Sequence, residues 1–199
     1  MLDKHWKIRL LSMSFVIWNS DTKEFENIAA APLTFGDGLI VHLDFGVSVT
    51  IVPSFVVRHI RTSVFPTDEN IARDNEQQDQ ACDLQHPVLP FTVPGHLGAS
   101  ICIEYRFANG KGGEVKILGP GINFLGQPNP YFHRKSKDRE GLVFVGSVDV
   151  SGNGAIFGLN FFQSMFVALH NPLSGDSYVE LAPQWEEHRM RYNLVPRGD

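Results

Sequence analysis

Alternation of apolar and polar side chains is the dominant pattern along this chain, and it predicts β-strands. Residues 101–107 alternate most clearly, residues 108–113 supply a Gly-rich turn, and residues 114–118 return as a second strand, which is typical of a β-hairpin. Residues 5–18 alternate in part and predict either a strand pair or one long bent strand. Further strands are expected at residues 142–145, 155–157, 164–169 and 178–181. The pattern as a whole predicts an all-β chain with short helical pieces.

One apolar run is set apart by the acid that ends it. Residues 39–43 (Leu-Ile-Val-His-Leu) are short and apolar enough for a buried strand, and Asp44 follows directly. Pro53 suits the first turn of a helix, where its missing N–H is not needed, and apolar side chains recur at helical spacing through residues 54–64. We therefore expect a buried strand, a loop that carries one carboxylate, and a short helix, in that order.

Composition supports a single β-rich domain. The chain has 199 residues, of which 43% are apolar, and this is enough for one sizeable core. Its 18 Gly, 12 Pro and 15 Phe residues suit many short strands joined by turns. Residues 66–80 are crowded with polar and acidic side chains and predict a surface loop. We expect one lobe over residues 1–186 and a tail over residues 187–199, whose Leu-Val-Pro-Arg-Gly resembles the remnant of a thrombin-cleavage tag.

Charge and motif content narrow the function classes. The net charge is −5 and no basic face is evident, so nucleic acid is not an expected partner. No apolar stretch approaches the length of a membrane span, so a membrane is not expected either. The eight His residues lack paired ligand spacing, and no phosphate-binding or dinucleotide-binding motif occurs, so neither a metal nor another cofactor is expected. Whether Cys82 and Cys102 form a disulfide is left open.

Three stretches, taken in order, carry a resemblance to a known family. Residues 5–10 (His-Trp-Lys-Ile-Arg-Leu) combine a Trp with alternating apolar positions. Residues 39–53 join an apolar strand, the loop Asp-Phe-Gly-Val-Ser and a Pro that begins a helix. Residues 154–162 (Gly-Ala-Ile-Phe-Gly-Leu-Asn-Phe-Phe) lead into residues 166–183, which end in Ala-Pro. In this order and approximate spacing they resemble the C-terminal lobe of the pepsin-like aspartic peptidases, in which the second stretch bears a catalytic aspartate.

The resemblance implies both a fold and a site. The fold would be mostly β, a pepsin-like acid-protease lobe of twisted antiparallel sheets or a partly closed barrel with short helices. Asp44 would be the catalytic carboxylate, Gly46 and Ser48 would bind substrate, and the segment that ends at Gly158 would thread beside the aspartate loop.

A single lobe of this family carries half of the catalytic chemistry. Two aspartates, one from each lobe, share a proton and activate one water between them. The resemblance therefore implies a half-site for a peptide or protein substrate. The second aspartate would come from a missing N-terminal lobe or from a second copy in a homodimer.

Two positions next to Asp44 depart from the family pattern. Phe45 replaces a Thr that bonds across the lobe junction, and Val47 replaces a hydroxyl residue that helps to hold the carboxylate, whereas Ser48 keeps the next position. A phenyl ring makes no such hydrogen bond. Two functions are therefore expected: an aspartic endopeptidase lobe that acts through Asp44 with impaired activity, or a non-catalytic relative that binds or inhibits proteins.

Overall fold

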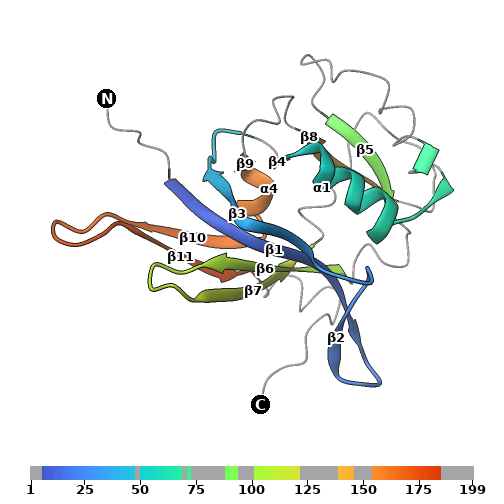
Figure 1. Ribbon diagram of the computed structural model, residues 1–199, viewed down its shortest axis with the longest axis horizontal. Coiled ribbons are helices and arrows are strands. Elements are labelled where there is room, and N and C mark those ends of the chain that lie inside the picture. The colour runs from blue at the N-terminus through green and yellow to red at the C-terminus, as the bar shows by residue number, and fades with distance from the viewer. Residues whose placement is uncertain are drawn as a thin grey trace.

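The computed structural model describes residues 6–47, 50–68, 71–72, 88–93, 101–121, 139–145 and 154–184. The fold over these residues is mostly β, as the alternating pattern predicts (Figure 1). A nine-stranded sheet curls into a half-barrel, and a separate two-stranded hairpin projects from it. Within the described ranges, every helical segment is too short or too polar to cross a membrane.

The strands and helical segments follow one another along the chain with the labels of Figure 1. The strands are β1 (Trp6–Asn19), β2 (Glu24–Asn27), β3 (Leu33–Leu43), β4 (Ile51–Val52), β5 (Val88–Val93), β6 (Ile101–Ala108), β7 (Glu114–Pro120), β8 (Arg139–Val145), β9 (Gly154–Phe157), β10 (Met165–His170) and β11 (Tyr178–Pro183). The helical segments are α1 (Ser54–His59), its π-helical continuation η1 (Ile60–Val64), and α4 (Leu159–Phe162). The large sheet has the order β5-β8-β4-β9-β3-β1-β6-β7, with β2 paired to β1, and β10 and β11 form the second sheet.

Strand β1 is the longest strand of the large sheet and pairs with β2, β3 and β6 (Figure 1). β3 pairs with it from Trp6, opposite Leu43, whereas β6 pairs with it only from Leu10, opposite Phe107, onward. The register shifts between Leu10 and Ser12, and such a bulge bends a strand. The prediction of one long bent strand is therefore confirmed, and the alternative of a strand pair is wrong.

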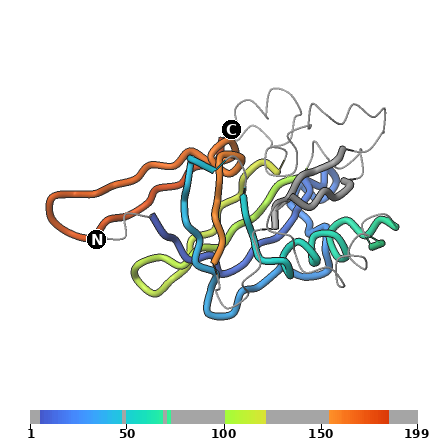
Figure 2. The backbone as a smooth tube through the Cα atoms, turned by 90° about the horizontal axis from the view of Figure 1, so that it is seen from above, coloured from blue at the N-terminus to red at the C-terminus, as the bar shows by residue number. Residues whose placement is uncertain are grey.

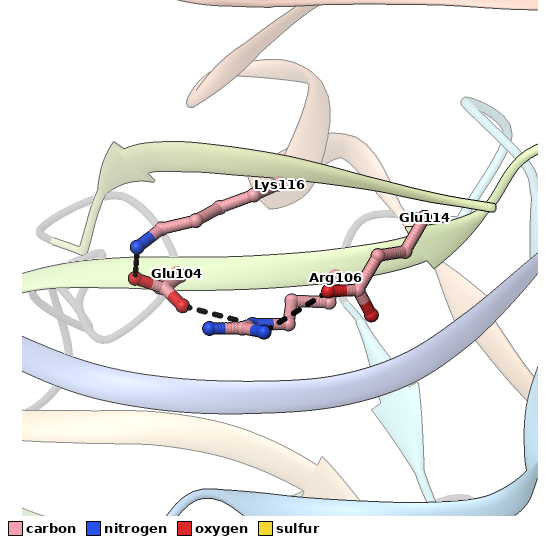
Figure 3. Close-up of polar contacts among 4 residues, drawn as sticks. All are labelled: Glu104, Arg106, Glu114 and Lys116. Carbon is pink, nitrogen blue, oxygen red and sulfur yellow. Dashed lines mark hydrogen bonds and ion pairs between the residues drawn. The ribbon is translucent and has the colours of Figure 1, made fainter.

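The hairpin predicted over residues 101–118 is confirmed as β6 and β7. Alternate side chains of β6 are buried in the core, while the opposite face of the hairpin carries a line of charges (Figure 3). Glu104 lies at the centre of this line, since its carboxylate oxygens are 3.2 Å from Arg106 Nε and 2.6 Å from Lys116 Nζ. Arg106 Nη1 also lies 3.1 Å from Glu114 Oε1. The charges of the two strands thus alternate in sign and pair across the hairpin.

Strands β3 and β5 are two of those that differ from the prediction, since β2 and β4 are also not expected from the sequence. β3 begins at Leu33 rather than at residue 39, because Gly36 and Gly38 continue the strand with φ values of 55° and 99°, which favour glycine. A side chain at Gly38 would also collide with the side chain of Arg9 on β1. No strand is expected from the sequence at Val88–Val93, yet β5 pairs there with β8. A proline inside this segment is atypical of a strand interior, which explains why the pattern misses it.

A single apolar core joins the half-barrel to the α1 and η1 segments. The helix predicted over residues 54–64 is confirmed, and its second half takes the wider π-helical form. Cys102 is fully buried, and burial raises the pKa of its thiol to about 12. Cys82 and the tail expected at residues 187–199 lie outside the described residues.

Candidate functional site

Strand β9 lies between β3 and β4, the two strands that the Asp44 loop connects (Figure 2). It runs parallel to β3, with Phe157 opposite Leu43, and antiparallel to β4. The chain between β3 and β4 must therefore cross the end of β9. Two backbone hydrogen bonds hold the crossing: the Asp44 N–H donates to the carbonyl of Phe157 (3.1 Å), and the Leu159 N–H donates to the carbonyl of Val47 (2.7 Å). The aspartate loop and the segment that contains β9 lie side by side, as the resemblance implies.

Asp44 is held by its own loop. It is half-buried, and its Oδ1 accepts a hydrogen bond of 2.9 Å from the N–H of Gly46. The Val47 N–H donates to the carbonyl of Asp44 at 3.3 Å, so the loop turns tightly behind the carboxylate. A Cβ at position 46 would lie 3.1 Å from Asp44 Oδ1, which is closer than ordinary contact. Glycine at position 46 therefore allows the carboxylate to fold back onto the loop backbone.

Apolar side chains occur on the Asp44 loop and on the α4 segment that is bonded to it. Phe45 is 74% exposed, and its ring meets Phe162 edge to face with centroids 6.4 Å apart. Leu159, which is bonded to the loop through its N–H, is 43% exposed. We call Asp44, Phe45, Leu159 and Phe162 the Asp44 face. Two of the apolar side chains of this face, Phe45 and Leu159, are thus exposed to solvent.

A buried hydrogen bond beneath the loop was not evident from the sequence. The hydroxyl of Thr50 donates to Oδ1 of Asn160 at 2.7 Å, and both residues are buried. The Ser164 hydroxyl also donates to the Asn160 carbonyl at 3.3 Å. These bonds tie the end of the aspartate loop to α4, since a buried polar pair of this kind is costly to separate. The polar Asn160 inside the apolar run of residues 154–162 is the signal that could have pointed to it.

The structure describes two of the three expected site residues. Asp44 and Gly46 are in direct contact through the hydrogen bond described above. Ser48 lies outside the described residues. In the described part of the chain, no group of three or more His, Cys, Asp or Glu side chains is placed to hold a metal ion.

A second polar cluster lies at the far end of the β10–β11 hairpin. His170 stacks on Tyr178 with ring centroids 4.4 Å apart and an interplanar angle of 5°. Its Nε2 lies 2.8 Å from Oε2 of Glu180 on the neighbouring strand. All three residues are paired partners or near neighbours in the hairpin register, so this cluster fastens the two strands to each other.

Comparisons with known proteins identify no family for this chain. No protein-family model matches this chain, and no curated protein matches it in sequence. The main features of the candidate site are the Asp44 loop, its crossing over the end of β9, and the exposed side chains of Phe45 and Leu159.

Proposed function

We propose that this chain is a lobe of the pepsin-like aspartic-peptidase type and that Asp44 forms one half of a peptide-cleaving site. The observation that carries the proposal is the position of Asp44 on a loop that joins β3 to β4 across the end of β9. The hydrogen bond from the Gly46 N–H orients the Asp44 carboxylate. A carboxylate that is held in this way and only half-buried can present an oxygen to a water molecule.

A single carboxylate does not complete the chemistry. Peptide hydrolysis by paired aspartates needs a second carboxyl group close enough to share one proton with the first. The exposed Phe45 and Leu159 beside Asp44 support a partner lobe or a second copy that covers this face and brings that group. Covering the face would also exclude bulk water from the shared proton.

The test is cleavage of an unfolded protein substrate between about pH 3 and about pH 7, where a dyad that shares one proton is active. The wild-type chain is compared with Asp44→Asn, which keeps the shape of the side chain and removes its charge. Asp21→Asn is the matched control, because Asp21 lies exposed in the turn between β1 and β2. In a homodimer, whose second copy supplies the other carboxyl group, we expect cleavage that Asp44→Asn abolishes and Asp21→Asn leaves unchanged. Equal cleavage by all three proteins would contradict the proposal.

One observation favours a second candidate, a non-catalytic lobe that binds protein. Phe45 stands where the family has a Thr, and its ring is exposed and packed against Phe162. In a binding lobe this ring would be a contact residue, since aromatic side chains dominate the energy of many interfaces. The variant Phe45→Thr separates the two candidates: it should raise cleavage in a peptidase lobe, and in a binding lobe it should leave cleavage absent at every pH.

A further inference from the structure

The turn between β6 and β7, at the free end of that hairpin in Figure 1, contains the pair Asn109-Gly110. Residues 109–113 are all exposed, and none of them belongs to the Asp44 face. The backbone closes the turn, since the Asn109 N–H donates to the Gly113 carbonyl at 2.9 Å. The chemistry of this turn is therefore separate from the function proposed above.

The Asn109 side chain folds back over the turn. Its Oδ1 accepts hydrogen bonds from the backbone N–H groups of Lys111 (3.0 Å) and Gly113 (2.8 Å). Asparagine side chains bond the following backbone in this way in many turns. Glycine at position 113 leaves room for the arrangement, because a Cβ there would lie 3.0 Å from Asn109 Nδ2. Two converging donors thus hold the side-chain amide by its oxygen.

The two nitrogen atoms next to this amide carbonyl make no hydrogen bond with a residue in the described part of the chain. They are Nδ2 of Asn109 itself and the backbone nitrogen of Gly110. Glycine has no side chain, so the approach of the Gly110 nitrogen to the amide is unhindered. A nucleophilic nitrogen, an amide carbon and a leaving group therefore lie within two adjacent residues.

We propose that Asn109 is a site of spontaneous deamidation and that the folded turn promotes the reaction. The Gly110 nitrogen attacks Cγ of Asn109, and a new C–N bond closes a five-membered succinimide ring. The bond from Cγ to Nδ2 breaks, and ammonia leaves with the proton of the Gly110 N–H. Water then adds to one of the two ring carbonyls and opens the ring, so that residue 109 becomes aspartate or isoaspartate.

The two backbone donors are placed to stabilise the intermediate of the first step. Attack at Cγ turns the carbonyl oxygen Oδ1 into an oxyanion, and N–H donors about 2.7–3.1 Å from such an oxygen lower the barrier. The Lys111 and Gly113 nitrogen atoms, at 3.0 Å and 2.8 Å from Oδ1, satisfy this geometry. The folded turn should therefore deamidate faster than the same residues in an unfolded chain.

The turn between β1 and β2 contains a matched asparagine with a different leaving group and neighbour. Oδ1 of Asn19 also accepts from two backbone N–H groups, those of Asp21 (2.8 Å) and Thr22 (3.3 Å). Its Nδ2, however, donates to Glu26 Oε1 at 2.7 Å, and the next residue is Ser20 rather than glycine. A bonded leaving group and a bulkier neighbour should both slow the reaction, so Asn19 is the internal reference.

The two products should differ in their effect on the hairpin. Aspartate keeps the backbone unchanged, and its carboxylate accepts the same two N–H groups more strongly than an amide does. Isoaspartate routes the main chain through Cγ, which adds one backbone carbon to the turn. The pairing of Ala108 with Glu114 at the end of the hairpin should then loosen. Deamidation would thus produce one form with a closed turn and one with a frayed hairpin end.

Peptide mass mapping during incubation near neutral pH measures the reaction at both asparagines. Trypsin cleaves after Lys and Arg, so it releases residues 107–111 and residues 10–23 as two peptides with one asparagine each. In the folded protein we expect Asn109 to deamidate at least about tenfold faster than Asn19. Asn109 should also react faster in the folded protein than in the same chain unfolded in urea.

Three turn variants test the roles of the nucleophile and of the donors. Gly110→Ala should fold, because a Cβ there meets nothing within 4 Å, and it should slow the reaction at least about tenfold by hindering the nucleophile. Lys111→Pro removes one donor to Oδ1 and should slow the reaction by about tenfold or more. Lys111→Ala is its matched control, because it keeps the backbone N–H and should leave the rate unchanged. The rate at Asn19 in the same digests should stay constant.

Three results would overturn the proposal. The first is a rate at Asn109 that does not exceed the rate at Asn19. The second is faster deamidation in urea than in the folded protein, since the turn would then protect the asparagine. The third is an equal rate in Lys111→Pro and Lys111→Ala, which would show that the backbone donors do not promote the reaction.

Discussion

The β6–β7 and β10–β11 hairpins have the same local design and very different surroundings. Both are antiparallel pairs of short alternating strands. β6 is paired with β1 on its other side, and Ile101 and Ile103 are fully buried. β10 and β11 form a sheet of their own, in which Phe166 and Tyr178 remain largely exposed. The first hairpin belongs to the core, and the second projects from it (Figure 1).

The difference shows that alternation specifies a hairpin but not its neighbours. A two-stranded hairpin is marginal by itself in water, so it depends on what it packs against. The β6–β7 hairpin gains a third strand along most of its length, whereas the β10–β11 hairpin is held mainly at its base by Met165 and Gln184. Stability should therefore reside mainly in the first hairpin.

The largest expected effect comes from truncating a buried side chain of the embedded hairpin. Ile103→Ala removes a fully buried side chain and should lower the free energy of unfolding by about 2–5 kcal/mol. Leu169→Ala in the projecting hairpin removes a side chain that is 37% exposed, and should cost less than about 1 kcal/mol. Urea unfolding of both variants measures the contrast. Equal losses would mean that the two hairpins contribute alike to the core.

Removing a tyrosine hydroxyl from each hairpin should give a smaller difference in the free energy of unfolding, and the change in the embedded hairpin should be stabilising. Tyr105 of β6 is buried among Phe107, Phe157 and Phe161, and its hydroxyl has no hydrogen-bond partner among the described residues. Burial also raises the pKa of this hydroxyl, because a charged oxygen would be desolvated there. Tyr105→Phe removes an unsatisfied polar group and should stabilise the fold by about 1 kcal/mol.

The matched variant for this hydroxyl lies in the projecting hairpin. Tyr178 is half exposed and stacks on His170, so its hydroxyl is in contact with water. Tyr178→Phe should change the free energy of unfolding by less than about 0.5 kcal/mol. Thermal unfolding compares the two variants with the wild type. Destabilisation by Tyr105→Phe would show that its hydroxyl has a partner after all.

Local pattern predicted the elements whose signal lies within one stretch of sequence. The long first strand, the β6–β7 hairpin and the helix after Pro53 were each predicted close to their observed bounds. The extent of β3 was missed, because positive φ values at Gly36 and Gly38 let the strand begin ahead of the apolar run on which the prediction rested.

Features that depend on distant contacts could not be predicted in this way. The hydrogen bond between Thr50 and Asn160 joins residues 110 positions apart. The Asp44 loop is intermediate, since its residues were identified from the sequence while the crossing over β9 appears only in the sheet order.

The smallest expected effect concerns the charges on the outer face of the embedded hairpin (Figure 3). Lys116→Ala removes the ion pair to Glu104, and Lys116 is more than half exposed, so the loss should be about 0.2–1 kcal/mol at low salt. Lys111→Ala is the matched control in the turn of the same hairpin, where Lys111 makes no ion pair with a described residue. Salt at about 1 M screens exposed charges within a few ångströms and should remove the difference between the two variants. A loss for Lys116→Ala that persists at high salt in urea unfolding would instead assign the contribution to packing of the lysine stem against the hairpin, as long side chains can cover apolar surface.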